Sequence, residues 1–175
     1  MGSKNRRANY DRGIVCGEGS DEVGFLKYLR SVYSSDPTNP KITNGRGGSP
    51  KKVVESIRKL PQYGAYSSRA ALFDDDKGAK LFNSALVEAK KAPSIKPIIA
   101  VPFFEYEMLK VHGATGGILK RAKADPVVAK EEFSRVCDGS ITGGALSYDK
   151  AFPKTLLDTK RRSSQWLDEV ISLFE

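Results

Sequence analysis

Two short apolar segments of this chain each end in acidic residues, and each is followed by a stretch with helical spacing of its apolar residues. Residues 13–16 end at a glycine turn that holds Glu18, and residues 70–73 run directly into three consecutive aspartates, residues 74–76. A strand, turn and helix that recur in this order are typical of a parallel sheet with helices on its faces. The repeated unit therefore predicts an α/β fold.

The same alternation continues along the chain. We expect two further strands, at residues 41–43 and within 96–101, and helices at four places: 21–33, 50–60, 78–91 and 103–112. The C-terminal third is predicted to be helical on either side of a loop, with helices in 118–137 and 154–174 and the loop at 141–153. The prediction is a mostly parallel central sheet of about four strands, flanked by helices, with a helical C-terminal extension.

We divide the chain into three parts that together make one domain. Residues 1–12 form a basic N-terminal arm, residues 13–112 form the core, and residues 113–175 form a helical part packed on it. With 175 residues, of which 39% are hydrophobic and 29% charged, the chain is expected to be soluble and folded.

The charge and the cysteines bear on partners and compartment. A formal net charge of +8 favours polyanionic partners, chiefly nucleic acid. Cys16 and Cys137 are predicted to be free thiols in a reducing compartment, the cytoplasm. No apolar run is long enough to cross a membrane, and the N-terminus lacks a signal-peptide core, so we expect no membrane partner.

The first acidic turn has two explanations. Asp21 and Glu22 suit the positive end of a helix, whose N-cap would be Ser20 or Asp21. Glu18 lies before the helix and is poorly explained in this way. The dinucleotide-binding pattern GxGxxG fails, because Glu22 stands where its third glycine would be. A divalent cation held by carboxylate oxygens is the other explanation.

The second acidic cluster makes a shared site the better explanation. Side chains alternate in an extended chain, so Asp74 and Asp76 point the same way and Asp75 points away. If the two strands are neighbours, Glu18 joins these two aspartates at one edge of the sheet. Carboxylates that close repel one another unless a cation lies among them or protons stay bound. The simpler alternative is an acidic loop in which Asp75 or Asp76 caps the next helix.

These residues resemble the Toprim domain, which topoisomerases, bacterial primases and OLD-family nucleases share. The chain is most similar to small stand-alone Toprim proteins of the RloB type. Their first motif resembles EGxxE, matched by Glu18, Gly19 and Glu22, and their second resembles FDxD, matched by residues 73–76. A later motif resembles PxFExWxLxH and is matched in part by PFFEYEMLKVH, residues 102–112.

The third motif departs from the family at two positions. Glu105 fits, but Glu107 replaces the family's tryptophan, and His112 falls one residue late. The resemblance covers residues 13–112 with the motifs in the expected order, and residues 113–175 match no family motif. A helix-end contact and a general acid both remain open as roles for His112.

The resemblance implies a nuclease that hydrolyses phosphodiester bonds of DNA or RNA with Mg²⁺ or Mn²⁺, in phage defence or in a mobile element. Two cations can neutralise the entering and leaving oxygens of phosphoryl transfer. Glu18, Glu22, Asp74 and Asp76 would be the metal ligands, with Glu18 as the base for the attacking water as the alternative role of that residue. Glu105 would complete the catalytic set with Glu18, Asp74 and Asp76, as an outer ligand or by orienting a metal-bound water, or else it is an ordinary acid in the first turn of a helix.

Basic residues would hold the nucleic acid in such an enzyme. Solvated helix faces are the alternative for most of them. The predicted nucleic-acid-binding residues are Arg46, Lys51, Lys77, Lys120 and Arg121. A non-catalytic Toprim-like module that binds nucleic acid or a partner protein is the competing functional class, and a partner protein could also activate or target the nuclease.

Overall fold

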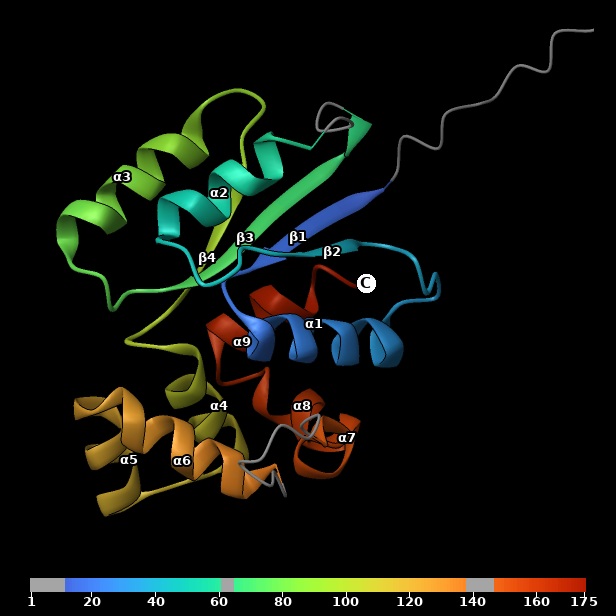
Figure 1. The fold of residues 1–175 in the computed structure, drawn as a ribbon. Helices are drawn as coiled ribbons and strands as arrows, with labels where there is room; N and C mark the ends of the chain where they lie inside the picture. The colour runs from blue at the N-terminus through green and yellow to red at the C-terminus, as the bar shows by residue number, and fades with distance from the viewer. Residues whose placement is uncertain (1–11, 61–64, 138–146) are drawn as a thin grey trace, which may run out of the picture.

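The computed structural model describes residues 12–60, 65–137 and 147–175. Residues 1–11, which make up nearly all of the predicted basic arm, lie outside the described residues. The strands are β1 (Gly13–Gly17), β2 (Lys41–Asn44), β3 (Ser68–Asp74) and β4 (Lys96–Ala100). They form one sheet in the order β2-β1-β3-β4, and every pair is parallel (Figure 1). The predicted α/β fold is confirmed.

Helices follow the strands as the sequence pattern predicts. The helices of the first 112 residues are α1 (Ser20–Tyr33), α2 (Pro50–Arg58), α3 (Ala79–Lys90) and α4 (Phe104–His112). The later ones are α5 (Gly116–Ala124), α6 (Pro126–Val136), α7 (Tyr148–Ala151), α8 (Lys154–Lys160) and α9 (Gln165–Ile171). The helical C-terminal region is therefore confirmed.

The prediction of a loop at 141–153 is wrong at residues 148–151, where α7 lies, and residues 141–146 of that loop lie outside the described residues. This single turn has no periodic apolar pattern that could reveal it. The Tyr148 side chain is 6% exposed, and its ring lies 5.7 Å from the ring of Phe25 and 6.2 Å from that of Tyr28, both on α1. Packing against residues distant in sequence thus stabilises the turn, and local propensity does not reveal such contacts.

Each face of the sheet has its own apolar core. Helices α2 and α3 cover one face, and α1 and α9 cover the other (Figure 1). Alternating residues of β1 and β3 serve the two cores, as a strand with both faces buried requires. The α2–α3 core contains Ile14, Cys16, Val53, Val54, Ile57, Ala71, Phe73, Ala85 and Ile95. The α1 core contains Val15, Phe25, Leu29, Leu72, Ile98, Phe104, Phe133, Tyr148, Phe152, Leu167 and Phe174.

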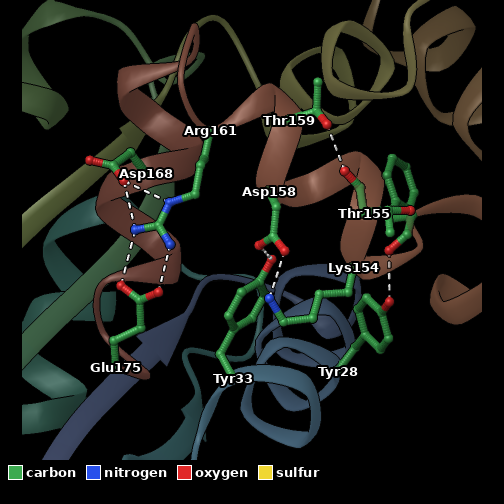
Figure 2. Close-up of polar contacts among 10 residues, drawn as sticks. Tyr28, Tyr33, Lys154, Thr155, Asp158, Thr159, Arg161, Asp168 and Glu175 are labelled. Carbon is green, nitrogen blue, oxygen red and sulfur yellow. Dashed lines mark hydrogen bonds and ion pairs between the residues drawn. The ribbon is translucent and has the colours of Figure 1, made fainter.

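Polar contacts join the C-terminal helices to α1 and to one another (Figure 2). The Tyr33 hydroxyl on α1 donates to Asp158 on α8 at 2.8 Å. The Arg161 guanidinium at the end of α8 binds the carboxylates of Asp168 on α9 and Glu175, with N–O distances of 2.8 and 2.6 Å. A planar fork that binds two carboxylates fixes the angle between α8 and the segment after it.

Two glycine turns meet where β1 and β2 end. Gly17 allows close packing, because an added Cβ would lie 2.9 Å from the Cβ of Glu22. In the β2–α2 turn, the Gly47 N–H donates to the Glu18 carbonyl oxygen at 2.8 Å. Arg46 in this turn has a φ of 59°, which is uncommon for a residue with a side chain. No helix in the described part of the chain is long and apolar enough to cross a membrane.

Candidate metal and phosphate site

The register of the sheet places the two acidic turns side by side. Cys16 is opposite Ala71 and Gly17 is opposite Leu72, so β1 and β3 end next to each other. Ligand sites in open α/β sheets lie at such carboxyl ends. A cavity of about 310 Å³ opens there, and we call it the acid pocket. Its acidic lining residues are Glu18, Asp21, Glu22, Asp74, Asp76 and Glu105.

Two of these acids, one in the β1–α1 turn and one in the first turn of α1, are almost fully buried. Glu18 is 6% exposed, and its Oε2 accepts the backbone N–H of Asp74 at 3.3 Å. Glu22 is 7% exposed and accepts the N–H of Gly19 at 3.0 Å. Gly19, rather than Ser20 or Asp21, is therefore the N-cap of α1. Burial raises the pKa of both glutamates.

Asp74 and Glu105 have strongly raised pKa values in the acid pocket. Burial, followed by the nearby charges of Glu22, Glu105 and Glu18, raises the pKa of Asp74 to about 8. Its Oδ1 accepts the backbone N–H of Phe104 at 2.9 Å, which ties the end of β3 to the start of α4. Burial raises the pKa of Glu105 to about 7. Without a bound cation, the pocket therefore retains protons near neutral pH.

Asp76 lies at the open side of the pocket beside Lys77. The Lys77 amine is 3.3 Å from Asp76 Oδ2 and 3.9 Å from Glu18 Oε1. Partial burial alone would lower the pKa of Lys77, but the charges of Asp76 and Glu18 outweigh it and raise the pKa. Asp75 does not line the pocket, as the strand alternation predicts. The capping explanation for the aspartates is wrong, because Gly78 is the N-cap of α3 and no side chain bonds that cap.

One wall of the pocket comes from the C-terminal third, which the sequence did not predict. Pro126 and Lys130 of α6 line it, and the Lys130 amine is 3.9 Å from Glu105 Oε1. Lys130 is the one lysine of α6, an amphipathic helix, and its spacing from the acidic motifs gives no local signal. Only the docking of α6 against α4 places it at the pocket.

Four of the five predicted nucleic-acid-binding residues do not line the acid pocket. Lys77 does, whereas Arg46 lies on the turn whose Gly47 lines it. Lys51 is 3.6 Å from Glu55 on its own helix. Lys120 and Arg121 are exposed on α5, and Arg121 is 3.7 Å from Glu132 of α6. Of the five predicted residues, the structure therefore places Lys77 at the acid pocket and Arg46 next to a lining residue.

His112 lies at the last position of α4 and is exposed, with its ring 5.9 Å from that of Phe152. It does not line the acid pocket. A general-acid role in the pocket therefore has no support from its position.

The acid pocket has suitable donors for a hard divalent cation, but they are not pre-arranged around one. Mg²⁺ and Mn²⁺ prefer carboxylate oxygens, and six carboxylic acids line the cavity. Within the described ranges, however, no three His, Cys, Asp or Glu side chains are grouped closely enough to hold an ion. Backbone N–H groups hold Glu18, Glu22 and Asp74, and the lysine amines lie beside Asp76 and Glu105.

In chemical terms, the site can bind a cation or a phosphate. The carboxylates would take a cation, while Lys77 and Lys130 present positive charge at the rim. Such a mixture of charges suits a ligand that carries both, such as a metal-bound phosphodiester. No family model, no curated protein and no solved structure matches this chain.

Proposed function

We propose that this protein is a divalent-metal-dependent nuclease built on a Toprim-like domain. The observation that carries the proposal is the convergence of six acids and two lysines in one cavity at the carboxyl ends of β1 and β3. An acidic cluster this costly persists in a fold when a ligand offsets its repulsion. The net charge of +8 supports nucleic acid as the substrate.

In this proposal, Glu18, Glu22, Asp74 and Asp76 hold Mg²⁺ or Mn²⁺. A divalent cation held by these residues would supply neutralising charge for the phosphoryl oxygens in phosphodiester hydrolysis. Glu105, on α4, is an outer ligand that orients the groups around the metal. Asp74 also positions Glu105. Its Oδ1 accepts the backbone N–H of Phe104 at the start of α4, the helix that carries Glu105.

The lysines hold the substrate. In the free protein, Lys77 and Lys130 lie near carboxylates and partly neutralise them. With a cation among the carboxylates, the two amines would be available to bind the phosphates of the nucleic acid. Their side chains are 41% and 67% exposed, so they can move without disturbing the core.

The test is cleavage of plasmid, single-stranded DNA and RNA with Mg²⁺, Mn²⁺ or a chelator. Glu18→Gln and Asp74→Asn should lower the rate by about 100-fold or more, because each replaces an anionic metal ligand with a neutral amide. Asp75→Asn is the matched control, since Asp75 is adjacent in sequence but does not line the pocket. Equal cleavage by wild type and the two pocket variants would assign the activity to a contaminant and exclude the proposal.

A non-catalytic binding module is the second candidate, and one observation favours it. Lys77 and Lys130 already lie beside the acids, so the pocket is partly neutralised without a metal. A binder uses its lysines and arginines, so Asp74→Asn would leave nucleic-acid affinity unchanged or raise it, with no cleavage by either protein. A nuclease would lose turnover in the variant and keep its affinity. Measuring binding and cleavage across a salt series separates the two.

A further inference from the structure

A second cavity system lies on the opposite face of α4 from the acid pocket. Glu105 lines the acid pocket and Glu107 lines the second system. Residues two apart on an α-helix point about 200° apart, so the helix separates the two sites. One cavity of about 350 Å³ and one of about 370 Å³ share the residues Glu107, Gln165 and Trp166. We call the two together the Trp166 groove.

The two ends of this groove differ in chemistry. Lys110 and Lys160 line one end, together with the seryl residues 163 and 164. The other end is lined by Pro97, Ile98, Ile99 and Val101, from β4 and the residue after it. Trp166 lines both ends. The groove thus offers a cationic end and an apolar end with an aromatic side chain between them.

The charges at the cationic end are not balanced. The Lys110 amine is 2.9 Å from Glu107 Oε2, and Glu169 at the apolar end is 3.4 Å from the Lys96 amine. Both acids of the groove are therefore paired. Lys160 is half-buried, and in the part of the chain that the structure describes it has no acidic partner. One positive charge is left for an anion.

Trp166 also has an unmet hydrogen-bonding capacity. Its indole N–H is buried and has no acceptor among the described residues. A buried donor without an acceptor costs free energy, which a ligand with an acceptor can recover after a small rotation of the ring. The ring itself is partly exposed, which leaves surface for stacking.

We propose that the Trp166 groove binds a nucleotide, with the base against Trp166 at the apolar end and the phosphate at Lys160. A nucleotide joins a flat aromatic group to an anion, which is the combination that the two ends require. Each cavity falls within the roughly 300–1,000 Å³ typical of small-molecule sites. The ligand is either a free nucleotide or the end of a nucleic-acid strand. This site shares no lining residue with the acid pocket and does not depend on the proposed nuclease activity.

Trp166 is the only tryptophan in the chain, so its fluorescence reports on the groove directly. AMP, adenosine and inorganic phosphate are titrated into the full chain, with excitation at the red edge of the indole band, where adenine does not absorb. We expect saturable quenching by AMP, with adenosine and phosphate each at least 10-fold weaker. A 5′-phosphorylated oligonucleotide that binds at least 10-fold tighter than AMP assigns the groove to the end of a nucleic-acid strand. An oligonucleotide affinity below this threshold assigns the groove to a free nucleotide.

Variants make the test specific. Lys160→Ala should weaken AMP binding at least 10-fold and Lys160→Arg should retain it, while Lys123→Ala, an exposed lysine of α5 outside the groove, should match wild type. Asp74→Asn should also bind AMP normally, which separates this site from the acid pocket. No saturable quenching by millimolar AMP, or unchanged affinity in a folded Lys160→Ala variant, overturns the proposal.

Discussion

Replacing Asp74 with asparagine should make the metal-free protein more stable at neutral pH. The pKa of Asp74 rises from its ordinary value of 3.8 to about 8, so its carboxyl stays protonated in the folded protein while the unfolded chain ionises. Each pH unit between the two pKa values lowers the free energy of unfolding by about 1.36 kcal/mol. At pH 7 the total loss is about 4 kcal/mol. Asparagine does not ionise in either state, so the variant does not lose this free energy of unfolding.

Asparagine does not recover the whole amount. Its carbonyl oxygen can still accept the Phe104 N–H, but its amide N–H₂ is a buried polar group that costs about 1–3 kcal/mol if unpaired. We therefore expect a net gain of about 2 kcal/mol at pH 7. At 2–4 °C per kcal/mol for a chain of this size, the melting temperature should rise by about 4–8 °C.

The sign of the pH dependence gives a second check. Below pH 3.8 the raised pKa of Asp74 does not change the free energy of unfolding, because the carboxyl is protonated in the folded and in the unfolded protein. Between pH 3.8 and pH 8 the raised pKa lowers the free energy of unfolding progressively. At pH 5 the destabilisation that Asp74 causes falls to about 2 kcal/mol, which the buried amide of the asparagine offsets, so the advantage of the variant should disappear. The stability of the wild type should fall correspondingly as the pH rises from 4 to 8.

Thermal melts followed by circular dichroism in a chelating buffer, at pH 5 and pH 7.5, measure this effect. Asp75→Asn is the matched control and should shift the melting temperature by less than about 2 °C, because its side chain does not line the pocket. If Asp74→Asn were no more stable than wild type at pH 7.5, or gained equally at both pH values, Asp74 would not carry the electrostatic cost argued for it.

Three further outcomes are expected. Mg²⁺ or Mn²⁺ at 100 times its Kd should stabilise the wild type by about 2.7 kcal/mol in a thermal-shift assay and leave Asp74→Asn unchanged, whereas equal shifts would place the ion elsewhere. Arg46→Gly should keep or raise stability by up to about 1 kcal/mol in urea melts, since glycine adopts the φ of 59° freely; a loss would show that the arginine side chain stabilises the turn. Tyr148→Phe should lose about 1 kcal/mol, because its hydroxyl donates to the Asp21 carbonyl oxygen at 2.8 Å, and an unchanged urea midpoint would contradict that contact.

The sheet and the acidic turns could be predicted because local pattern and topology agree there. Strand β1 and strand β3 are short, apolar and buried, and in an α/β fold such strands run parallel. Parallel neighbours end at the same edge, so the meeting of Glu18 with Asp74 followed from their positions after each strand. The N-cap at Gly19 was missed because Glu22, rather than the cap residue, makes the side-chain bond.

The rest of the site depends on tertiary packing that no short motif encodes. Lys130 reaches Glu105 because α6 packs against α4, and the sequence does not specify that docking locally. Likewise, the predicted contributions of Lys51, Lys120 and Arg121 rested on charge alone, which does not fix where a helix face points. No local motif in the sequence predicts the Trp166 groove either, since it joins residues from β4, α4, α8 and α9.

The two apolar cores differ in when they can be completed during synthesis. The α2–α3 core is made entirely from residues 14–99, whereas the α1 core includes residues up to Phe174. A ribosome delivers the N-terminal part first, so one side of the sheet can be covered while Phe25 and Leu72 on the other side still face solvent. The wall of the acid pocket that α6 supplies, with Pro126 and Lys130, also follows the α2–α3 core along the chain. The complete pocket therefore forms only after α6 has been made, and the uncovered side of the sheet is the surface that a chaperone would bind until the α1 core is complete.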